Sequence, residues 1–184
     1  MAETFTNNGE GRIFMAPADT EVADTVSGVV AAVTASESVW IDLGSIHEDG
    51  LTVTPRSVDG ELKDWNGSVK AQKTSTTWSF KTIDFLNEAA VKAAYGASNV
   101  TVESESGTVH VDYDGGMPEP CVLVAIMKDG DNCVVEYLRN AKCSELGDVT
   151  YKDGEYSAND MTFKGEKPTS GKDRGRLFSA KKGA

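Results

Sequence analysis

The chain has 184 residues and a formal net charge of −11, from 18 Lys and Arg against 29 Asp and Glu. Hydrophobic residues make up 39% and charged residues 26%, a balance that excludes a disordered tract and a membrane protein. The shortage of positive charge argues against a conventional nucleic-acid binder, because affinity for phosphate comes mainly from Lys and Arg.

The charge is divided unevenly along the chain. Residues 164–184 have a net charge of +5, so residues 1–163 carry −11 − 5 = −16. We therefore expect a single β-domain over residues 1–163, with a partly irregular N-terminal arm over about residues 1–35. The Gly-, Lys- and Ser-rich remainder, residues 164–184, is expected to be a basic, flexible C-terminal arm.

The three cysteines indicate packing rather than chemistry. Cys121, Cys133 and Cys143 match no zinc spacing and no even disulfide framework. They lie in or beside apolar strand-like segments, which favours buried free thiols over a nucleophilic pair with His. The first residues show no secretory signal, and the longest apolar stretch, 28–33, is far below the roughly 20 residues of a membrane helix. We expect a soluble protein made in a cytoplasm, without a membrane partner.

Turn chemistry predicts a mainly β fold. Asp-Gly and Asn-Gly pairs recur along the chain, and a Gly with positive φ suits the tight turns that join antiparallel strands. Residues 122–127 are continuously apolar, as in a strand that is buried on both faces. The predicted strands are residues 12–16, 38–46, 51–58, 68–74, 77–83, 100–103, 108–113, 122–128, 133–139, 149–152 and 156–163.

One helix is predicted over residues 85–95. Asp84 is the expected N-cap, Glu88 lies near the positive end of the helix dipole, and Gly96 suits the stop. Residues 21–35 are consistent with either a short helix or a loop. The fold class is therefore an antiparallel β-sandwich or barrel with one flanking α-helix.

A search for chemistry predicts no enzyme, no metal site and no cofactor. The run of His47, Glu48 and Asp49 precedes a glycine, so a turn is favoured over a metal ligand set. His110 is expected to face solvent or a neighbouring subunit. Residues 129–132 begin like a calcium loop but lack its spacing, which favours a hairpin tip. No nucleophile motif or phosphate loop is present.

An ordered series of short motifs carries a family resemblance over about residues 38–164. The motifs are Trp40–Ile46, Glu48–Pro55, Glu61–Gly67, Trp78–Phe80, Ala94–Gly96, Asn99–Thr101 and Gly147–Glu155. Together they resemble the major tail protein, or tail tube protein, of long, non-contractile-tailed bacteriophages (siphophages), particularly those of high-GC Gram-positive hosts.

The resemblance implies a structural virion protein. Such a subunit forms hexameric rings, which stack into a tail tube that conducts double-stranded DNA during ejection. Its implied partners are copies of itself and the tape measure, tail terminator and distal tail proteins. An acidic wall suits this role, since it repels phosphate and does not hold the passing duplex.

Two segments are expected to contact neighbouring copies. The resemblance places ring-to-ring contacts in the long loop 47–74, where the candidates are Leu51, Arg56, Asp64 and Trp65. Trp65 is equally consistent with a cap on its own barrel, whereas Trp40 and Trp78 are expected in the core. The basic arm, with Lys172, Arg174 and Arg176, is expected to dock on an acidic neighbour.

Two alternatives remain open at this point. One is a subunit of a type VI secretion-like or other phage-derived tube, whose tube protein has the same fold. The other is a β-sandwich binding module, against which the small number of aromatic residues argues, with three Trp and five Tyr.

Overall fold

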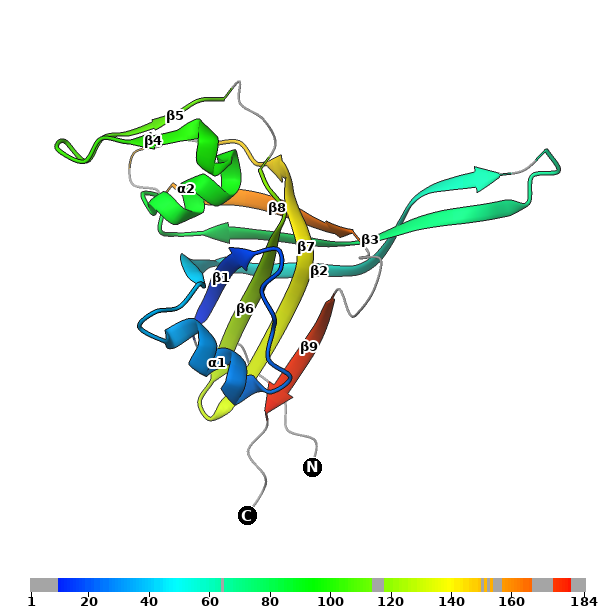
Figure 1. Cartoon of the computed structure of the whole chain (residues 1–184), viewed down its shortest axis with the longest axis horizontal. Coiled ribbons are helices and arrows are strands. Elements are labelled where there is room, and N and C mark those ends of the chain that lie inside the picture. Colours follow the sequence, from blue (N-terminus) through cyan, green and yellow to red (C-terminus); the bar gives the residue numbers. More distant parts are fainter. Residues whose placement is uncertain are drawn as a thin grey trace, which may run out of the picture.

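Six antiparallel strands close into a barrel in the computed structural model, which describes residues 10–63, 65–113, 118–149, 151, 153, 157–166 and 174–179. Each strand is hydrogen-bonded to the next, and the additional pairing of the first with the last completes the circle (Figure 1). In spatial order they are β6 (Cys121–Asp129), β1 (Gly11–Pro17), β2 (Ile41–Lys63), β3 (Val69–Thr82), β8 (Asn159–Glu166) and β7 (Asn132–Leu146). The predicted mainly β class is confirmed.

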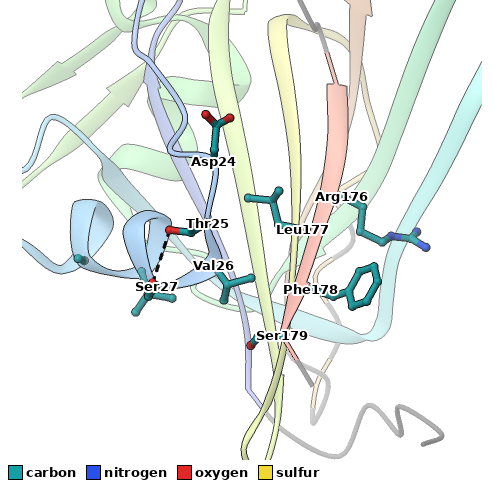
Figure 2. A pocket seen from close by; sticks show the side chains of 10 residues that line it. Asp24, Thr25, Val26, Ser27, Arg176, Leu177, Phe178 and Ser179 are labelled. Atoms are coloured by element: carbon teal, nitrogen blue, oxygen red, sulfur yellow. Dashed lines mark hydrogen bonds between the residues drawn. The ribbon is translucent and has the colours of Figure 1, made fainter. Parts of the chain in front are cut away.

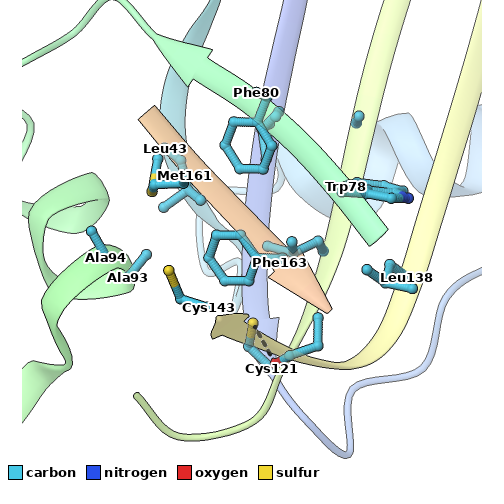
Figure 3. Close-up of a cluster of buried hydrophobic side chains, with 14 of the residues drawn as sticks. Leu43, Trp78, Phe80, Ala93, Ala94, Cys121, Leu138, Cys143, Met161 and Phe163 are labelled. Atoms are coloured by element: carbon cyan, nitrogen blue, oxygen red, sulfur yellow. Dashed lines mark hydrogen bonds between the residues drawn. The ribbon is translucent and has the colours of Figure 1, made fainter. Parts of the chain in front are cut away.

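The barrel interior holds the larger of two hydrophobic cores (Figure 3). All six strands contribute to it, and the rings of Phe80 and Phe163 stack with their centroids 5.7 Å apart. Its largest fully buried side chains include Trp78, Phe163, Ile13, Leu43, Leu123, Leu138 and Met161.

The second core lies on the outer face of β1, β6 and β7, beneath helix α1 (Val26–Thr34). Residues 21–35 thus contain a helix, which Thr25 caps by accepting a hydrogen bond from the Gly28 amide at 3.1 Å. Trp40 is buried in this core and Trp78 in the barrel, as expected. Strand β6 is covered on both faces, which explains the continuously apolar run at residues 122–127.

Helix α2 (Glu88–Tyr95) packs its alanines against the barrel core, and Gly96 ends it with φ +91°. The predicted start was wrong: Asn87, not Asp84, is the N-cap, and its side chain accepts from the Ala89 and Ala90 amides. Asp84 instead accepts a hydrogen bond from the Ser45 amide at 2.8 Å. A short 3₁₀ turn (Ala97–Asn99) and a two-stranded sheet, β4 (Val100–Val102) with β5 (Val109–Val111), follow the helix.

Two of the hairpin turns predicted from Asp-Gly pairs were wrong. The Asp-Gly pairs at 49–50 and 59–60 lie within one strand, which passes them as irregularities in its pairing with β3. Gly50 has φ +80°, so it supplies the left-handed residue that a bulge needs as much as a turn does. True hairpin turns occur at Asn66-Gly67, between β2 and β3, and at Asp129-Gly130, between β6 and β7.

Strand β7 changes its neighbour midway. Residues 133–138 pair with β9 (Arg174–Ser179), and residues 141–146 pair with β8. Between them, Asn140 has φ +50°, a conformation that Asn tolerates better than most residues. This kink lets one strand serve two partners on the same edge.

Strand β9 also corrects the expectation of a flexible arm. Residues 164–166 belong to β8, and residues 174–179 are a sheet strand. Composition misled here because the positive charge of Arg176 is matched by Glu136 on β7. The domain division itself stays a prediction. Of the strand predicted at 149–152, residues 149 and 151 are not in a strand, and residues 150 and 152 lie outside the described residues.

Candidate assembly surfaces

The β2–β3 hairpin extends beyond the barrel wall (Figure 1). β1 pairs with β2 only from Ile41 to Ser45, and β8 pairs with β3 only from Ser75 to Thr82. Beyond those pairs, residues 58–63 and 69–74 are paired only with each other in the described part of the chain. A two-stranded ribbon has marginal stability in water, so this segment gains most from a further surface to pack against.

The hairpin candidates occupy different environments. Trp65 lies at the tip and is fully exposed, with 101% relative accessibility, which excludes a cap on its own barrel. Leu51 is half-buried, packs against the barrel core and pairs with Phe80, so it anchors the hairpin root. Arg56 lies in the β2 strand, and Asp64 is outside the described residues.

The arm candidates are held partly by their own chain. Arg176 donates from Nε to Glu136 Oε1 in an ion pair, and Glu136 is only 7% exposed. Arg174 is half-buried opposite Leu138, whereas Lys172 lies outside the described residues. Sequence reasoning missed Glu136, although a single carboxylate within the apolar run 133–138 was a usable sign of a buried partner.

A groove of about 800 Å³ separates α1 from β9 and is called the α1–β9 groove (Figure 2). Leu177 points toward the helix, whereas Arg176 and Phe178 point to the other side of the strand. Phe178 is 73% exposed. The groove is lined by residues 24–27, Val30, Ala31 and 176–179.

A second groove, of about 870 Å³, lies where β3 leads into α2 and is called the β3–α2 groove. Its lining includes the ion pair of Arg12 with Asp42, whose Nη2 and Oδ2 atoms are 2.7 Å apart. Three of its apolar side chains are exposed, namely Ile83, Leu86 and Tyr151. The remaining lining residues are Asp84, Phe85, Asn87 and Ser157.

The cysteine thiols are poorly suited to nucleophilic chemistry. All three cysteines are free and buried. Burial raises the pKa of the Cys121 thiol to about 12 and that of Cys143 to about 11, so both stay protonated near neutral pH.

The two histidines occupy structural positions. His47 Nδ1 accepts a hydrogen bond from the Asp49 amide at 3.2 Å. Both residues lie where the pairing of β2 with β3 is irregular, at the position of the predicted turn. Lys81 Nζ lies 2.9 Å from Asp49 Oδ2 and, as donor and positive charge, lowers the pKa of that carboxyl. His110 is exposed, with Nε2 3.5 Å from Glu103 Oε1. Within the described ranges, no group of three or more His, Cys, Asp or Glu could hold a metal ion.

The exposed charge of the described surface is strongly acidic. Its exposed carboxylates are Glu10, Asp19, Glu21, Asp24, Glu37, Glu48, Asp49, Asp84, Glu88, Glu103, Glu105, Asp112, Glu119, Asp131, Glu145, Asp148 and Asp153. The exposed Lys and Arg of the same residues are Lys63, Lys128, Lys142 and Arg176. The negative charge counted from the sequence is therefore carried on the surface.

A family profile described as phage tail tube protein matches residues 3–165 of the 184. The chain belongs to the phage tail tube protein family. This confirms the resemblance to a phage tail tube protein that was drawn from the motifs. The family places this tail tube protein in the virion tail, implies self-assembly into a tube with other tail proteins, and indicates a structural, non-enzymatic role.

A comparison with curated proteins finds no match. Neither of the described helices is long and apolar enough to cross a membrane.

Proposed function

We propose that this tail tube protein polymerises as hexameric rings, which stack into the tube of a long, non-contractile phage tail. The observation that carries the proposal is the β2–β3 hairpin. Its outer part pairs only with itself among the described residues and ends on a fully exposed Trp65. Large exposed aromatic side chains at such a position are typical anchors of protein interfaces.

The geometry of the hairpin is compatible with rings and tubes. The tip would contact a different surface, the barrel, on another copy. Where that copy does not return the contact, the interface is head to tail and repeats from copy to copy, giving a ring if the rotation closes and a filament if it does not. Stacked rings contain both kinds of repeat.

The contact candidates are refined by their surroundings. On the hairpin, Trp65, Arg56 and Asp64 are the proposed contacts, and Leu51 holds the root of the hairpin against its own barrel. In the arm, Lys172 and Arg174 are the proposed contacts with a neighbour. Arg176 contributes less between copies because its charge is already paired with Glu136.

The negative net charge of the subunits opposes their assembly, but it is compatible with the passage of DNA. Six copies carry 6 × (−11) = −66, so a ring must be held by apolar and backbone contacts and by local pairs, not by overall attraction. The same carboxylates would repel the phosphates of double-stranded DNA, so that the duplex passes through the lumen without specific binding. The tape measure, tail terminator and distal tail proteins are the proposed tail partners, and the host bacterial cytoplasm the proposed place of synthesis.

Electron microscopy of the purified full-length protein over a range of concentrations tests the proposal. Hollow tubes with six-fold end views are expected, with a polymer fraction that rises above a critical concentration in sedimentation. A species that stays monomeric at all concentrations and salt levels would overturn it. Rings of another symmetry would overturn the hexamer alone.

Retention of a DNA duplex on nitrocellulose filters tests the conduit. Assembled tubes are expected to retain no more duplex at low salt than an acidic control protein of similar charge. Strong retention that salt weakens would contradict a repelling wall.

A further inference from the structure

The β3–α2 groove takes no part in the contacts proposed above. Its exposed apolar residues are Ile83 (46%), Tyr151 (75%) and Leu86 (88%). Single exposed apolar residues are ordinary, but several gathered around one groove mark an interaction site. We infer that this groove receives the hairpin tip of a second copy of the chain, with Trp65 against Leu86. The inference rests on the proposed tube function and names the receiving surface.

Apolar surface is exposed on both sides. Trp65 presents a whole indole to solvent, and the groove of about 870 Å³ has aliphatic and aromatic walls. The rings of Tyr151 and Phe85 pack at right angles, with centroids 5.9 Å apart, so part of the wall is held in place. A rigid aromatic anchor in a preformed groove is the arrangement that typically dominates an interface.

The topology requires the occupant to come from another copy. Trp65 lies in the turn that joins β2 to β3, and Ile83 follows directly on the last residue of β3. The 14 residues of β3 therefore separate the tip from the groove, about 45 Å along an extended strand. A hairpin that is continuous with this strand cannot fold back onto its own groove, so a tip that fills the groove must come from another copy.

Cross-linking between two different single variants tests the pairing directly. Asn66→Cys places a thiol at the tip and keeps Trp65, and Ile83→Cys places one in the groove and keeps Leu86. The native cysteines are buried, so a short bismaleimide applied to assembled full-length protein reports the new thiols. A covalent dimer is expected when the two variants are mixed, and not with either one alone. The matched control pairs Asn66→Cys with Ala31→Cys, in the α1–β9 groove.

Double substitution gives an independent measurement. Trp65→Ala and Leu86→Ala are each expected to raise the critical concentration for tube formation about tenfold. Together they should raise it little further, because both remove the same contact. Phe178→Ala, which removes another exposed aromatic side chain, this one from β9, is expected to change it less than threefold.

The outcomes separate this inference from the proposed function. Suppose that the wild-type protein forms tubes, but the mixed variants give no covalent dimer, or a dimer forms through Ala31→Cys instead. Either result would overturn the pairing of the tip with the β3–α2 groove and leave the proposed tube function intact. The pairing would also be overturned if the double alanine variant raised the critical concentration by the product of the two single effects. If the wild-type protein forms no tubes, the proposed function fails first and the inference fails with it.

Discussion

The barrel and the hairpin are made from the same two strands, yet they differ in what holds them. In the barrel, β3 has β2 on one edge and β8 on the other, and its inward side chains are buried. In the outer hairpin, each strand has only the other among the described residues. One part is stable through its own contacts, and the other is the part that we propose is completed by another copy.

This contrast separates folding from assembly. Substitutions in the barrel should lower the free energy of unfolding of the monomer, and matched substitutions at the hairpin tip should leave it unchanged. The tip should instead affect the concentration at which tubes form. Four predictions test this division, in order of decreasing size.

Removing an aromatic ring separates the two regions most strongly. Phe163→Ala leaves a cavity beside Phe80 and should lower the free energy of unfolding by about 3–5 kcal/mol. Trp65→Ala should change it by less than about 0.5 kcal/mol, because the indole is fully exposed. Urea denaturation of the monomeric protein measures both. Equal losses would show that the tip packs on its own chain.

The ion pair that fastens β9 should have the next largest effect. Arg176→Ala leaves the Glu136 carboxylate buried without its partner, which should cost about 1–2 kcal/mol. The loss stays below that of a fully buried pair because the Arg176 side chain is 62% exposed. Denaturation of the double variant with Glu136→Gln checks the cause: removal of the stranded charge should restore part of the loss. A double variant less stable than Arg176→Ala alone would contradict it.

Two residues with positive φ give a smaller, matched test. Asn140→Val in the wall should cost about 1 kcal/mol or slightly more, because a β-branched residue resists φ +50°. Gly67→Ala at the tip meets similar strain at φ +76°, but it should mainly loosen the turn, which opens independently of the barrel. Hydrogen exchange should show faster exchange only near residues 63–69 in the second variant. Faster exchange throughout its barrel would be inconsistent with a separable hairpin.

The pair of Asp49 and Lys81 should give the smallest effect, with a defined pH dependence. Lys81 lowers the pKa of Asp49, so the stabilisation is full above the ordinary Asp value of about 3.9 and is lost as pH falls through the lower folded value. Asp49→Asn should therefore be slightly less stable than the wild type from pH 5 to 8, and the difference should close in strong acid. A difference that grows below pH 3 would contradict the sign.

Local patterns predicted much of the barrel. The apolar run at 122–127 indicated a strand covered on both faces, and Asn66-Gly67 and Asp129-Gly130 marked real hairpins. The failures share one cause. A bulge and a turn both need a Gly with positive φ, and Asp84 and Asn87 are equally good caps until the Ser45 amide takes the first. In each case a contact distant in sequence decides between two locally equivalent structures.

Only some of the candidate surfaces could be predicted from the sequence. Trp65 could be placed on the long loop because the motif series runs through it. The β3–α2 groove could not, because its lining comes from residues near 12, 42, 83–87 and 151, which only the closed barrel brings together. β9 was missed because its partner, Glu136, is about forty residues away.

The continuity of β2 and β3 has a mechanical consequence. No loop separates the wall of the barrel from the tip of the hairpin, so a pull on Trp65 would be carried along a ladder of backbone hydrogen bonds into the barrel itself. The irregular pairings along β2 are the points at which that ladder can bend. A tube joined through such hairpins would curve at a few defined places in each subunit and resist stretching everywhere else.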